Sequence, residues 1–379
     1  MRTIRFGIIG CGLMGREFAS AAARWCHLLD VDVRPEIVAV CDQNEALFGW
    51  YKTNFPGVKI ATKDYKDLLK SSEVDAIYCA VPHNLHAQLY VDIITAGKHL
   101  LGEKPFGIDR AANQKILAAI KANPKTFVRC SSEFPFFPAV QRIYQVARDG
   151  KLGTILEVHS GFHHSSDLDV SKPINWKRKV EFNGEYGCMG DLGLHTLHIP
   201  LRLGWKPRDV RAVLSKIVKE RPDGKGGMAV CDTWDNATLL TTVTDPRNGQ
   251  PFPMTVSTKR ISPGDTNSWF FKVYGTKMCM EFTTRYPKTL RSLEYTGGEQ
   301  AWRDEDLGYT SVMKTITGHI FEFGFTDSIL QMWAAFCVEL DKGASALPFG
   351  CVTPDETAVS HELFTAALVS QKENRVVVL

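Results

Sequence analysis

The chain has 379 residues, of which 44% are hydrophobic, and its formal net charge is +3. This length exceeds one ordinary hydrophobic core and predicts two domains, while the small charge gives no reason to expect nucleic acid or an anionic membrane as a partner. No apolar run approaches the roughly 20 residues that span a bilayer, and no apolar leader is followed by a cleavage site, so we expect a cytoplasmic protein.

The first third of the chain alternates between apolar strands and helices. Apolar strands that alternate with helices are typical of a parallel, doubly wound α/β sheet, because both faces of such a sheet are buried. The predicted strands lie at 4–9, 36–42, 74–82, 98–105 and 125–132, and the predicted helices at 16–25, 64–72, 86–97 and 109–123. Residues 1–130 are therefore predicted to form a Rossmann domain.

A glycine turn follows the first predicted strand. Gly10, Gly12 and Gly15 form G-x-G-x-x-G, in which the glycines allow a tight turn, close approach of a pyrophosphate and close helix–strand packing. Asp42 ends the second strand, where its carboxylate can bind a ribose 2′-hydroxyl and repel a 2′-phosphate. This pattern predicts NAD rather than NADP. The expected cofactor contacts at this turn are Gly10, Gly12, Leu13, Met14, Gly15 and Asp42.

Two later strand ends also carry polar side chains. "AVPHNLHA" follows the strand at 74–82, and "GEKPFG" follows the strand near 100. In a parallel sheet, ligands lie beyond the carboxyl ends of the strands, so a lysine there would face the nicotinamide end of the cofactor. The alternative is a solvated surface lysine. We expect further cofactor contacts from Pro82, His83, His86, Glu103 and Lys104.

The pattern changes after residue 130. A helix is predicted at 139–153, and extended segments rich in Thr, Val and aromatic residues follow it, which is typical of a mostly antiparallel sheet. These segments lie at 154–164, 209–220, 233–244, 253–262, 268–284 and 291–297, and helices close the chain at 328–343 and 354–371. Residues 131–379 are predicted to be a substrate-binding and oligomerisation domain. The ten scattered cysteines are interpreted as reduced thiols, several of them in the core.

The segment "MGDLGLHTLHIP" at 189–200 places unusual residues inside this second half. On one helix, Asp191, His195 and His198 would lie at i, i+4 and i+7 and share a face. A structural helix would carry Leu or Ile in such a row. The pattern therefore indicates a functional surface.

These motifs together resemble the Gfo/Idh/MocA oxidoreductase family. The resemblance rests on "GCGLMG", "VPHNLHA", "GEKP" and "GDLGLH", in this order, and it covers essentially the whole chain. It implies an N-terminal Rossmann domain that binds NAD and a C-terminal α/β domain with a large, open, mostly antiparallel sheet. The outer face of that sheet commonly forms the oligomer contact, which implies a homo-oligomer, a dimer or a tetramer. Members oxidise or reduce one hydroxyl carbon of a sugar, cyclitol or similar polyol.

By this resemblance, Lys104, Asp191 and His195 match the family's catalytic residues. Removal of hydride from a carbinol carbon requires loss of the hydroxyl proton. A histidine side chain, whose ordinary pKa lies near neutral pH, can accept this proton, and a lysine can relay it. Asp191 could orient the imidazole or bind a neighbouring hydroxyl. His198 replaces the family's usual acid, and it could pack under the site, contact substrate or, with Asp191 and His195, bind a metal. We expect no metal, because hydride transfer to NAD needs none.

The substrate pocket also departs from the family pattern. Glu133 and Pro135 stand where relatives often carry Asn and Arg. The sequence "WKRK" could bind the anionic group of a carboxylated or sulfonated sugar, or it could be a solvated loop. Candidate substrate contacts are His163, His164, Trp176, Arg178 and His198, with Lys177, Trp234, Lys259 and Arg260 as further pocket candidates.

The leading hypothesis is therefore an NAD-dependent dehydrogenase that acts on a sugar, glycoside or cyclitol. A redox-neutral glycosidase of the same fold is the closest alternative, in which oxidation, elimination of the aglycone and re-reduction would use the same residues. A non-enzymatic NAD-sensing regulator is a third hypothesis, which the presence of Lys104, Asp191 and His195 disfavours.

Overall fold

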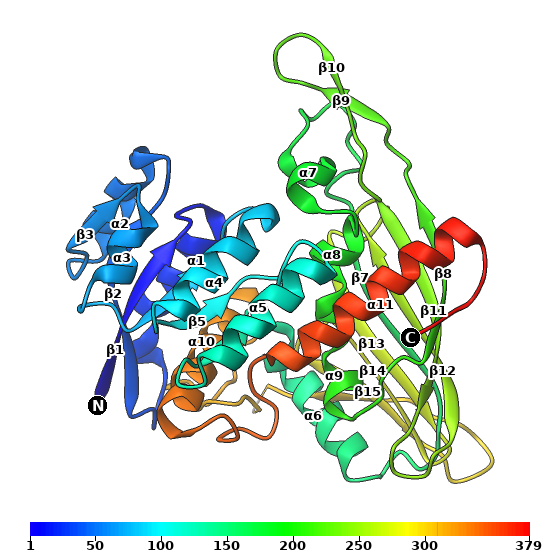
Figure 1. The fold of residues 1–379 in the computed structure, drawn as a ribbon. Coiled ribbons are helices and arrows are strands. Elements are labelled where there is room, and N and C mark those ends of the chain that lie inside the picture. The colour runs from blue at the N-terminus through cyan, green and yellow to red at the C-terminus, as the bar shows by residue number, and fades with distance from the viewer. Residues whose placement is uncertain (309) are drawn as a thin grey trace. The chain divides into compact units, whose positions relative to one another are not determined.

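The computed structural model describes residues 1–308 and 310–379. The contacts of the chain divide it into two compact units (Figure 1). The first unit comprises 1–107, 111–137 and 308–354, and the second comprises 108–110, 138–307 and 355–379.

The first unit is built on a six-stranded parallel sheet with the strand order β3-β2-β1-β4-β5-β6. This order reverses at β1, which is the doubly wound arrangement that the sequence predicts. The strands are β1 (Arg2–Ile9), β2 (Val33–Cys41), β3 (Ile60–Thr62), β4 (Ala76–Cys79), β5 (His99–Gly102) and β6 (Val128–Cys130). The helices are α1 (Leu13–Ala23), α2 (Phe48–Asn54), α3 (Tyr65–Lys70), α4 (His86–Thr95), α5 (Arg110–Ala122) and α10 (Phe325–Lys342), with short 3-10 turns η1 (Trp25–His27), η2 (Glu45–Leu47), η3 (His83–Leu85) and η4 (Phe134–Phe136).

The predicted single boundary at residue 130 differs from this division. The segment 308–354 returns to the first unit, where α10 packs against α1 and β2. Trp333 of α10 is fully buried and stacks on Phe18, with ring centroids 3.5 Å apart, and Phe18 also stacks on Tyr78 at 3.9 Å. This aromatic packing buries a large apolar area and holds the late helix against the early sheet.

The second unit contains a nine-stranded sheet with the order β16-β15-β14-β13-β7-β12-β11-β8-β17. Neighbouring strands of this sheet run antiparallel except for β12 and β7, which are parallel, so the sheet is mostly antiparallel, as the sequence predicts. The strands are β7 (Ile155–His164), β8 (Asp209–Ser215), β11 (Asn236–Thr244), β12 (Pro251–Lys259), β13 (Asn267–Gly275), β14 (Met278–Thr283), β15 (Thr289–Glu294), β16 (Arg303–Asp306) and β17 (Val377–Val378), and β9 (Glu220–Pro222) pairs with β10 (Met228–Val230) in a separate hairpin. The remaining elements are α6 (Pro138–Arg148), η5 (Trp176–Arg178), α7 (Val180–Asn183), α8 (Cys188–Leu192), η6 (Leu194–Thr196), α9 (His198–Arg202) and α11 (Pro354–Glu373).

The two faces of the large sheet have different roles. Phe162 pairs in register with Trp269 and Thr258, and all three contact the segment of α8 and η6: Trp269 and Phe162 through His195, and Thr258 through Cys188. Because side chains alternate along a strand, the neighbouring residues His163, Ser268 and Lys259 point to the opposite face. We call the face that carries Phe162 the inner face and the other the outer face.

All ten cysteines are free thiols, and eight of them are buried, which fits their interpretation as core residues. Cys26 is exposed and Cys279 is half-buried. Among the described residues, no helix has both the length and the apolar character needed to cross a membrane.

Candidate active site

The glycine turn between β1 and α1 has the close contacts that its sequence predicts. A side chain at Gly10 would meet the Ala80 carbonyl oxygen at 2.1 Å, and one at Gly15 would meet the Gly10 oxygen at 2.1 Å. Gly12, by contrast, has no atom within 4 Å of the position a Cβ would take. The open space at Gly12, before the first turn of α1, suits close approach of a pyrophosphate to the backbone.

Asp42 lies directly after β2 and is tied to this turn. Its Oδ2 accepts a hydrogen bond from the Cys11 amide at 2.8 Å, and its Oδ1 accepts one from the Asn44 amide at 2.8 Å. The two bonds fix the carboxylate at the sheet edge and leave acceptor capacity for a ribose hydroxyl. A carboxylate here disfavours a 2′-phosphate. These residues fit an NAD molecule, with the pyrophosphate at Gly12 and the adenosine ribose at Asp42.

The other predicted cofactor contacts divide into two groups. Lys104 is half-buried rather than solvated, and Glu103, 7% exposed, accepts a hydrogen bond from the Tyr78 hydroxyl at 2.7 Å. His86, however, is fully buried, and its ring nitrogens lie 2.7 Å from the Pro105 oxygen and 2.9 Å from the Val81 oxygen. Burial lowers the pKa of His86 to about 4. The prediction that His86 binds the cofactor directly is therefore corrected: this ring fixes the loop that follows Lys104.

The rest of the predicted contacts line the same edge. Leu13 is exposed, Met14 and Pro82 are half-buried, and His83 is buried in the turn η3.

The second unit does not place 189–200 on one continuous helix. The helix α8 ends at Leu192, the turn η6 covers Leu194–Thr196, and α9 begins at His198. Gly193 lies at the break, where a Cβ would meet the Phe364 ring at 2.3 Å and the Met189 oxygen at 2.4 Å. The predicted shared face of Asp191, His195 and His198 is therefore wrong in its regular spacing, because the segment is divided into α8, the 3-10 turn η6 and α9.

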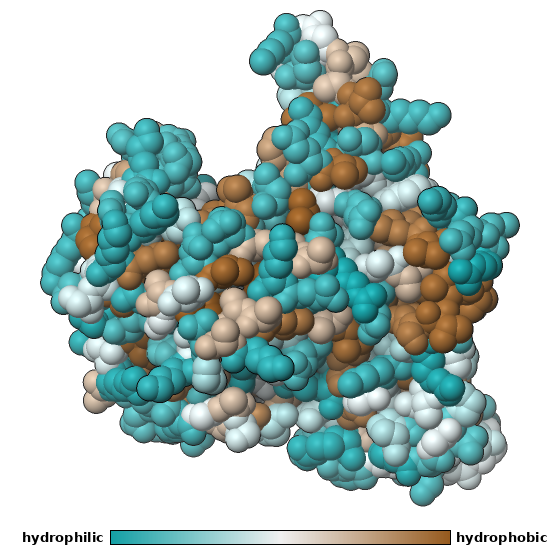
Figure 2. Space-filling view, viewed as in Figure 1, coloured by the Kyte–Doolittle hydropathy of each residue, from teal (hydrophilic) through white to brown (hydrophobic). Residues whose placement is uncertain are grey.

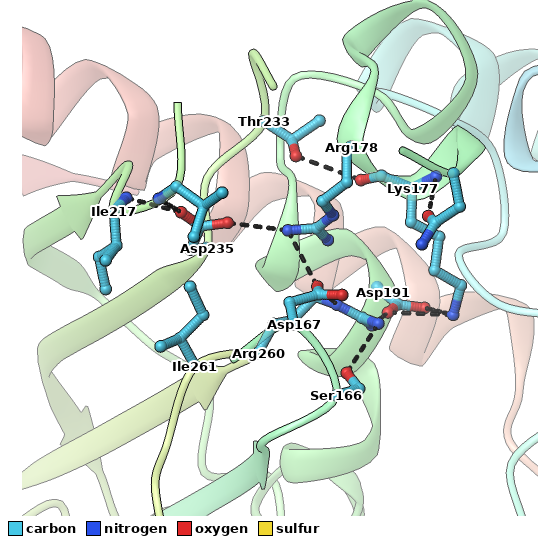
Figure 3. Close-up of polar contacts among 12 residues, drawn as sticks. Ser166, Asp167, Lys177, Arg178, Asp191, Ile217, Thr233, Asp235, Arg260 and Ile261 are labelled. Atoms are coloured by element: carbon cyan, nitrogen blue, oxygen red, sulfur yellow. Dashed lines mark hydrogen bonds and ion pairs between the residues drawn. The ribbon is translucent and has the colours of Figure 1, made fainter. Parts of the chain in front are cut away.

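Asp191 is 1% exposed and is held by two cations (Figure 3). The Lys177 Nζ donates to its Oδ1 at 3.1 Å and to its Oδ2 at 3.3 Å, and Arg260 donates to Oδ2 from the other side. Paired charges with hydrogen bonds on both oxygens compensate the cost of burying a carboxylate. The arrangement fixes the position of Asp191.

The charge network continues behind Asp191. Arg260 also donates to Asp167 at 2.7 Å, and Arg178 contacts Asp167 at 3.1 Å and Asp235 at 2.8 Å (Figure 3). Burial would raise the pKa of Asp167, but Arg260 and Arg178 hold it below its usual range. Arg178 is 0% exposed. Its predicted contact with substrate is therefore corrected to a structural role, since both of its ion pairs lie in the protein interior.

His195 is 3% exposed and lies in η6. The Trp269 Nε1 donates to its backbone oxygen at 2.6 Å, and the Phe162 ring meets the imidazole edge-to-face with centroids 5.4 Å apart. These contacts from β13 and β7 position the imidazole on the inner face of the large sheet.

His198 lies close to His195, with ring centroids 6.3 Å apart. It is 1% exposed, and burial together with the Arg202 charge lowers its pKa to about 3. These features favour the packing histidine over the substrate contact. No group of three His, Cys, Asp or Glu side chains in 1–308 and 310–379 is arranged to hold a metal ion.

The remaining substrate candidates lie on different faces. His163 points to the outer face, where its Nε2 lies 2.8 Å from the Ser257 hydroxyl and its Nδ1 3.5 Å from Asp265. The prediction that it joins His195 at a substrate site is therefore wrong, because the sheet separates them. His164 shares the inner face with Phe162, at 4.6 Å between ring centroids. Trp176 is half-buried in η5, next to Lys177.

Lys177 and Arg260 were predicted from the sequence as pocket residues, but their contact with Asp191 was not predicted. Lys177 lies 14 positions before Asp191 and Arg260 lies 69 after it, so no local spacing relates the three residues. The cluster of cations in "WKRK" indicated that this region could bind a charged group, but it did not indicate which of the cations contacts a buried carboxylate.

A sequence model of an oxidoreductase family with an NAD-binding Rossmann fold matches residues 4–130, and a model of the GFO/IDH/MocA C-terminal domain matches residues 140–281. The chain belongs to the Gfo/Idh/MocA oxidoreductase family. The resemblance, the fold class and the NAD-binding Rossmann domain that the sequence predicts are thereby confirmed.

Several curated proteins are similar to this chain. Levoglucosan dehydrogenase of Pseudarthrobacter phenanthrenivorans is 26% identical over 60% of this chain and 58% of the relative, and the rhizopine catabolism protein MocA of Rhizobium meliloti is 28% identical over 73% and 77%. For four curated relatives, levoglucosan dehydrogenase among them, the match covers only 41% to 60% of the relative's own length. A solved levoglucosan dehydrogenase, in complex with NADH and L-sorbose, has a TM-score of 0.87 at 21% identity over 100% of this chain and 99% of its own, which shows the shared fold.

Proposed function

We propose that this chain is an NAD-dependent dehydrogenase that transfers hydride between the hydroxyl carbon of a sugar, glycoside or cyclitol and the nicotinamide. The observation that carries the proposal is the buried carboxylate of Asp191, held by Lys177 and Arg260 close to His195 in the sequence. A buried carboxylate with two cations is costly to build for packing alone, since apolar residues would serve as well. The family that contains this chain has an NAD-binding first domain.

Each residue has a role in the proposed reaction. Bound NAD supplies the hydride acceptor. His195 accepts the hydroxyl proton, because a neutral imidazole is the base best suited to this step near neutral pH. Asp191, fixed by its two cations, accepts a hydrogen bond from a substrate hydroxyl and holds it in place. Lys104, half-buried at the end of β5, relays the proton.

The charge balance around Asp191 supports an uncharged polyol over an anionic sugar. The network joins three carboxylates to three cations, so no cation in it is left in excess. Its members are Asp167, Asp191, Asp235, Lys177, Arg178 and Arg260. An anionic substrate would therefore find no net positive charge in this network, whereas a hydroxyl group can both donate to Asp191 and accept from Lys177.

The proposal extends to a homo-oligomer that assembles through the large sheet. Figure 2 shows hydrophobic residues gathered where Figure 1 draws β8 and β11. Val213 of β8 is 59% exposed and Leu240 of β11 is 51% exposed. Exposed apolar residues that cluster on a sheet face favour a protein contact. Sedimentation or light scattering would test this, and a monomer at micromolar concentration would contradict it.

The experiment that tests the enzymatic proposal is one assay with NAD and a panel of free sugars, inositols, uronates, sulfonated sugars and aryl glycosides. NADH and released aglycone are both followed. NADH that rises in proportion to the substrate consumed supports the dehydrogenase. Aglycone released over many turnovers without net NADH would instead establish a redox-neutral glycosidase.

A further inference from the structure

A cluster of ionisable side chains lies at the carboxyl ends of β4, β5 and β6. Tyr78 belongs to β4, Glu103 and Lys104 follow β5, and Glu133 follows β6. The Tyr78 hydroxyl donates to Glu103 at 2.7 Å, and the charges of Glu103 and Lys104 both act on Glu133. Glu133 is 6% exposed, so this cluster places two buried carboxyl groups and one lysine at a single sheet edge.

The nicotinamide half of NAD must lie toward this cluster. The sheet order is β3-β2-β1-β4-β5-β6, with Asp42 after β2 and the glycine turn after β1. If the adenosine ribose binds at Asp42 and the pyrophosphate at Gly12, the other half of the dinucleotide extends past β4 toward β5 and β6. This follows from the order of the strands, since ligands cross the carboxyl edge of such a sheet.

Glu133 differs from Glu103 in its partner. Glu103 holds the Tyr78 hydroxyl, whereas the charged neighbours that act on Glu133 are Glu103, which disfavours its ionisation, and Lys104, which favours it. Burial raises the pKa of Glu133 to about 7, against the smaller opposing effects of its own backbone amide and of Lys104. A small change in nearby charge therefore changes its protonation at neutral pH.

We propose that Glu133 is a proton-binding site coupled to the charge of the bound nicotinamide, ionised beside NAD⁺ and protonated beside NADH. The positive ring of NAD⁺ favours the carboxylate, and reduction removes that positive charge and favours the acid. Turnover rests on the proposed dehydrogenase function. In it, hydride from the carbinol carbon reduces the nicotinamide ring, and the hydroxyl proton passes through Lys104 to Glu133 and then to solvent. One C–H and one O–H bond break, and the carbonyl, NADH and one proton result. Glu133 acts through Lys104 and is thus a positioning residue.

Two other ionisable groups at this sheet edge, His86 and Tyr78, do not titrate near neutral pH. Burial lowers the pKa of His86 to about 4 and raises that of Tyr78 far above its ordinary value. The helix α10 packs against η4, and its charged residues form ion pairs elsewhere. These pairs are Asp327 with Arg24, Glu339 with Arg129, Asp341 with Arg2 and Lys342 with Asp32.

The test is cofactor binding, which needs no substrate. The dissociation constants of NAD⁺ and of NADH are measured by calorimetry from pH 6 to pH 8, for the wild type, Glu133→Gln, Glu133→Asp and Glu339→Gln. In the wild type we expect NAD⁺ affinity to rise relative to NADH affinity by up to about tenfold between pH 6 and pH 8. The reason is that a ligand which lowers the pKa of a linked acid by about 1 binds about tenfold more tightly once the acid is ionised. NAD⁺ binding should also release a fraction of a proton, measured in two buffers of different ionisation enthalpy.

The variants separate this effect from folding and from turnover. Glu133→Gln should bind NADH normally and lose the pH dependence specific to NAD⁺, whereas Glu133→Asp should retain one with a shifted midpoint. Glu339→Gln, which changes another buried glutamate of the same unit and breaks its pair with Arg129, should lower stability but keep the wild-type pH dependence of NAD⁺ and NADH binding. If NAD⁺ and NADH show the same pH dependence in the wild type, or if Glu133→Gln keeps the difference, the proposal is wrong. A lack of turnover on every substrate would contradict the dehydrogenase instead and leave this result intact.

Discussion

The Lys177 ammonium lies 3.1 Å from the Asp191 carboxylate, and the two side chains differ sharply in exposure, at 30% and 1%. Lys177 thus connects a buried carboxylate to the solvent side of the second unit. Arg260 contacts the same carboxylate from the interior. Asp191 contacts one interior cation, Arg260, and one partly exposed cation, Lys177, which solvent can reach.

We therefore expect Lys177→Met to reduce catalysis without reducing NAD affinity. Loss of a hydrogen bond to a charged group costs about 1.5–3 kcal/mol, which corresponds to a fall of about 10- to 150-fold in kcat/KM. Steady-state kinetics and NAD titration measure the two effects. Lys179→Met, two residues away in the same loop, is the control and should leave both unchanged; equal losses in the two variants would show that Lys177 has no special role.

Arg178→Met should destabilise the protein strongly. The variant removes the cation that Asp167 and Asp235 share, and both carboxylates are almost completely buried. Breaking a buried pair in this way costs about 3–5 kcal/mol in the free energy of unfolding, which urea denaturation measures. Arg148→Met breaks an exposed pair with Asp149 and should cost less than about 1 kcal/mol. A similar small cost for both would contradict the structural role of Arg178.

Gly12→Ala should separate folding from cofactor binding. A methyl group at Gly12 meets no atom of the chain within 4 Å, so thermal stability without NAD should stay within about 1 kcal/mol of the wild type. The same methyl group would occupy the space of the pyrophosphate, and NAD affinity should fall by at least about tenfold. Gly49→Ala adds a methyl group in equally open space on α2 and should bind NAD normally. Normal NAD binding by Gly12→Ala would contradict the assigned pyrophosphate position.

Asp42→Asn should weaken the preference for NAD over NADP. The amide oxygen keeps one of the two backbone hydrogen bonds, while the negative charge that repels a 2′-phosphate is lost. The ratio of NADP to NAD affinity should rise by about tenfold, measured by fluorescence titration of both cofactors. Glu45→Gln removes an exposed charge nearby and should not change the ratio. An unchanged ratio in Asp42→Asn would mean that another residue selects the cofactor.

The pH dependence of the free energy of unfolding should also show whether Glu133 titrates near neutral pH. A buried acid with a raised pKa binds more protons in the folded state than in the unfolded one, so its contribution to stability falls as pH rises from about 4.5 to about 7. Glu133→Gln lacks this contribution. The variant should therefore gain stability relative to the wild type across that window, by up to about 3 kcal/mol, and the gain should level off above it. A difference that does not change with pH would show that Glu133 does not titrate as described.

The sequence predicts the Rossmann unit well because its signals are local. Continuous apolar strands and the glycine turn specify that sheet within short stretches, and the structure confirms them. The return of Trp333 to the first unit depends on aromatic packing with residues more than 250 positions away, which no local pattern encodes.

The site was less predictable for two physical reasons. Asp191 and His195 lie on either side of the change from α8 to η6, at Gly193, which packs closely against Phe364 of the distant helix α11, whereas a regular helical spacing assumes one continuous helix. The side on which His163 lies depends on strand register, where a shift of one residue exchanges the two faces. Residue type alone does not tell His163 from His164.

The central claim, hydride transfer from a hydroxyl carbon to NAD, is tested most directly with a substrate deuterated at the carbon that is oxidised. The substrate is the most active compound in the panel, and the NADH formed is analysed by mass spectrometry. The proposed function predicts one deuterium in each NADH molecule and none in the solvent. Deuterium that exchanges into water, or that returns to the same carbon of a cleaved product without net NADH, would contradict a dehydrogenase.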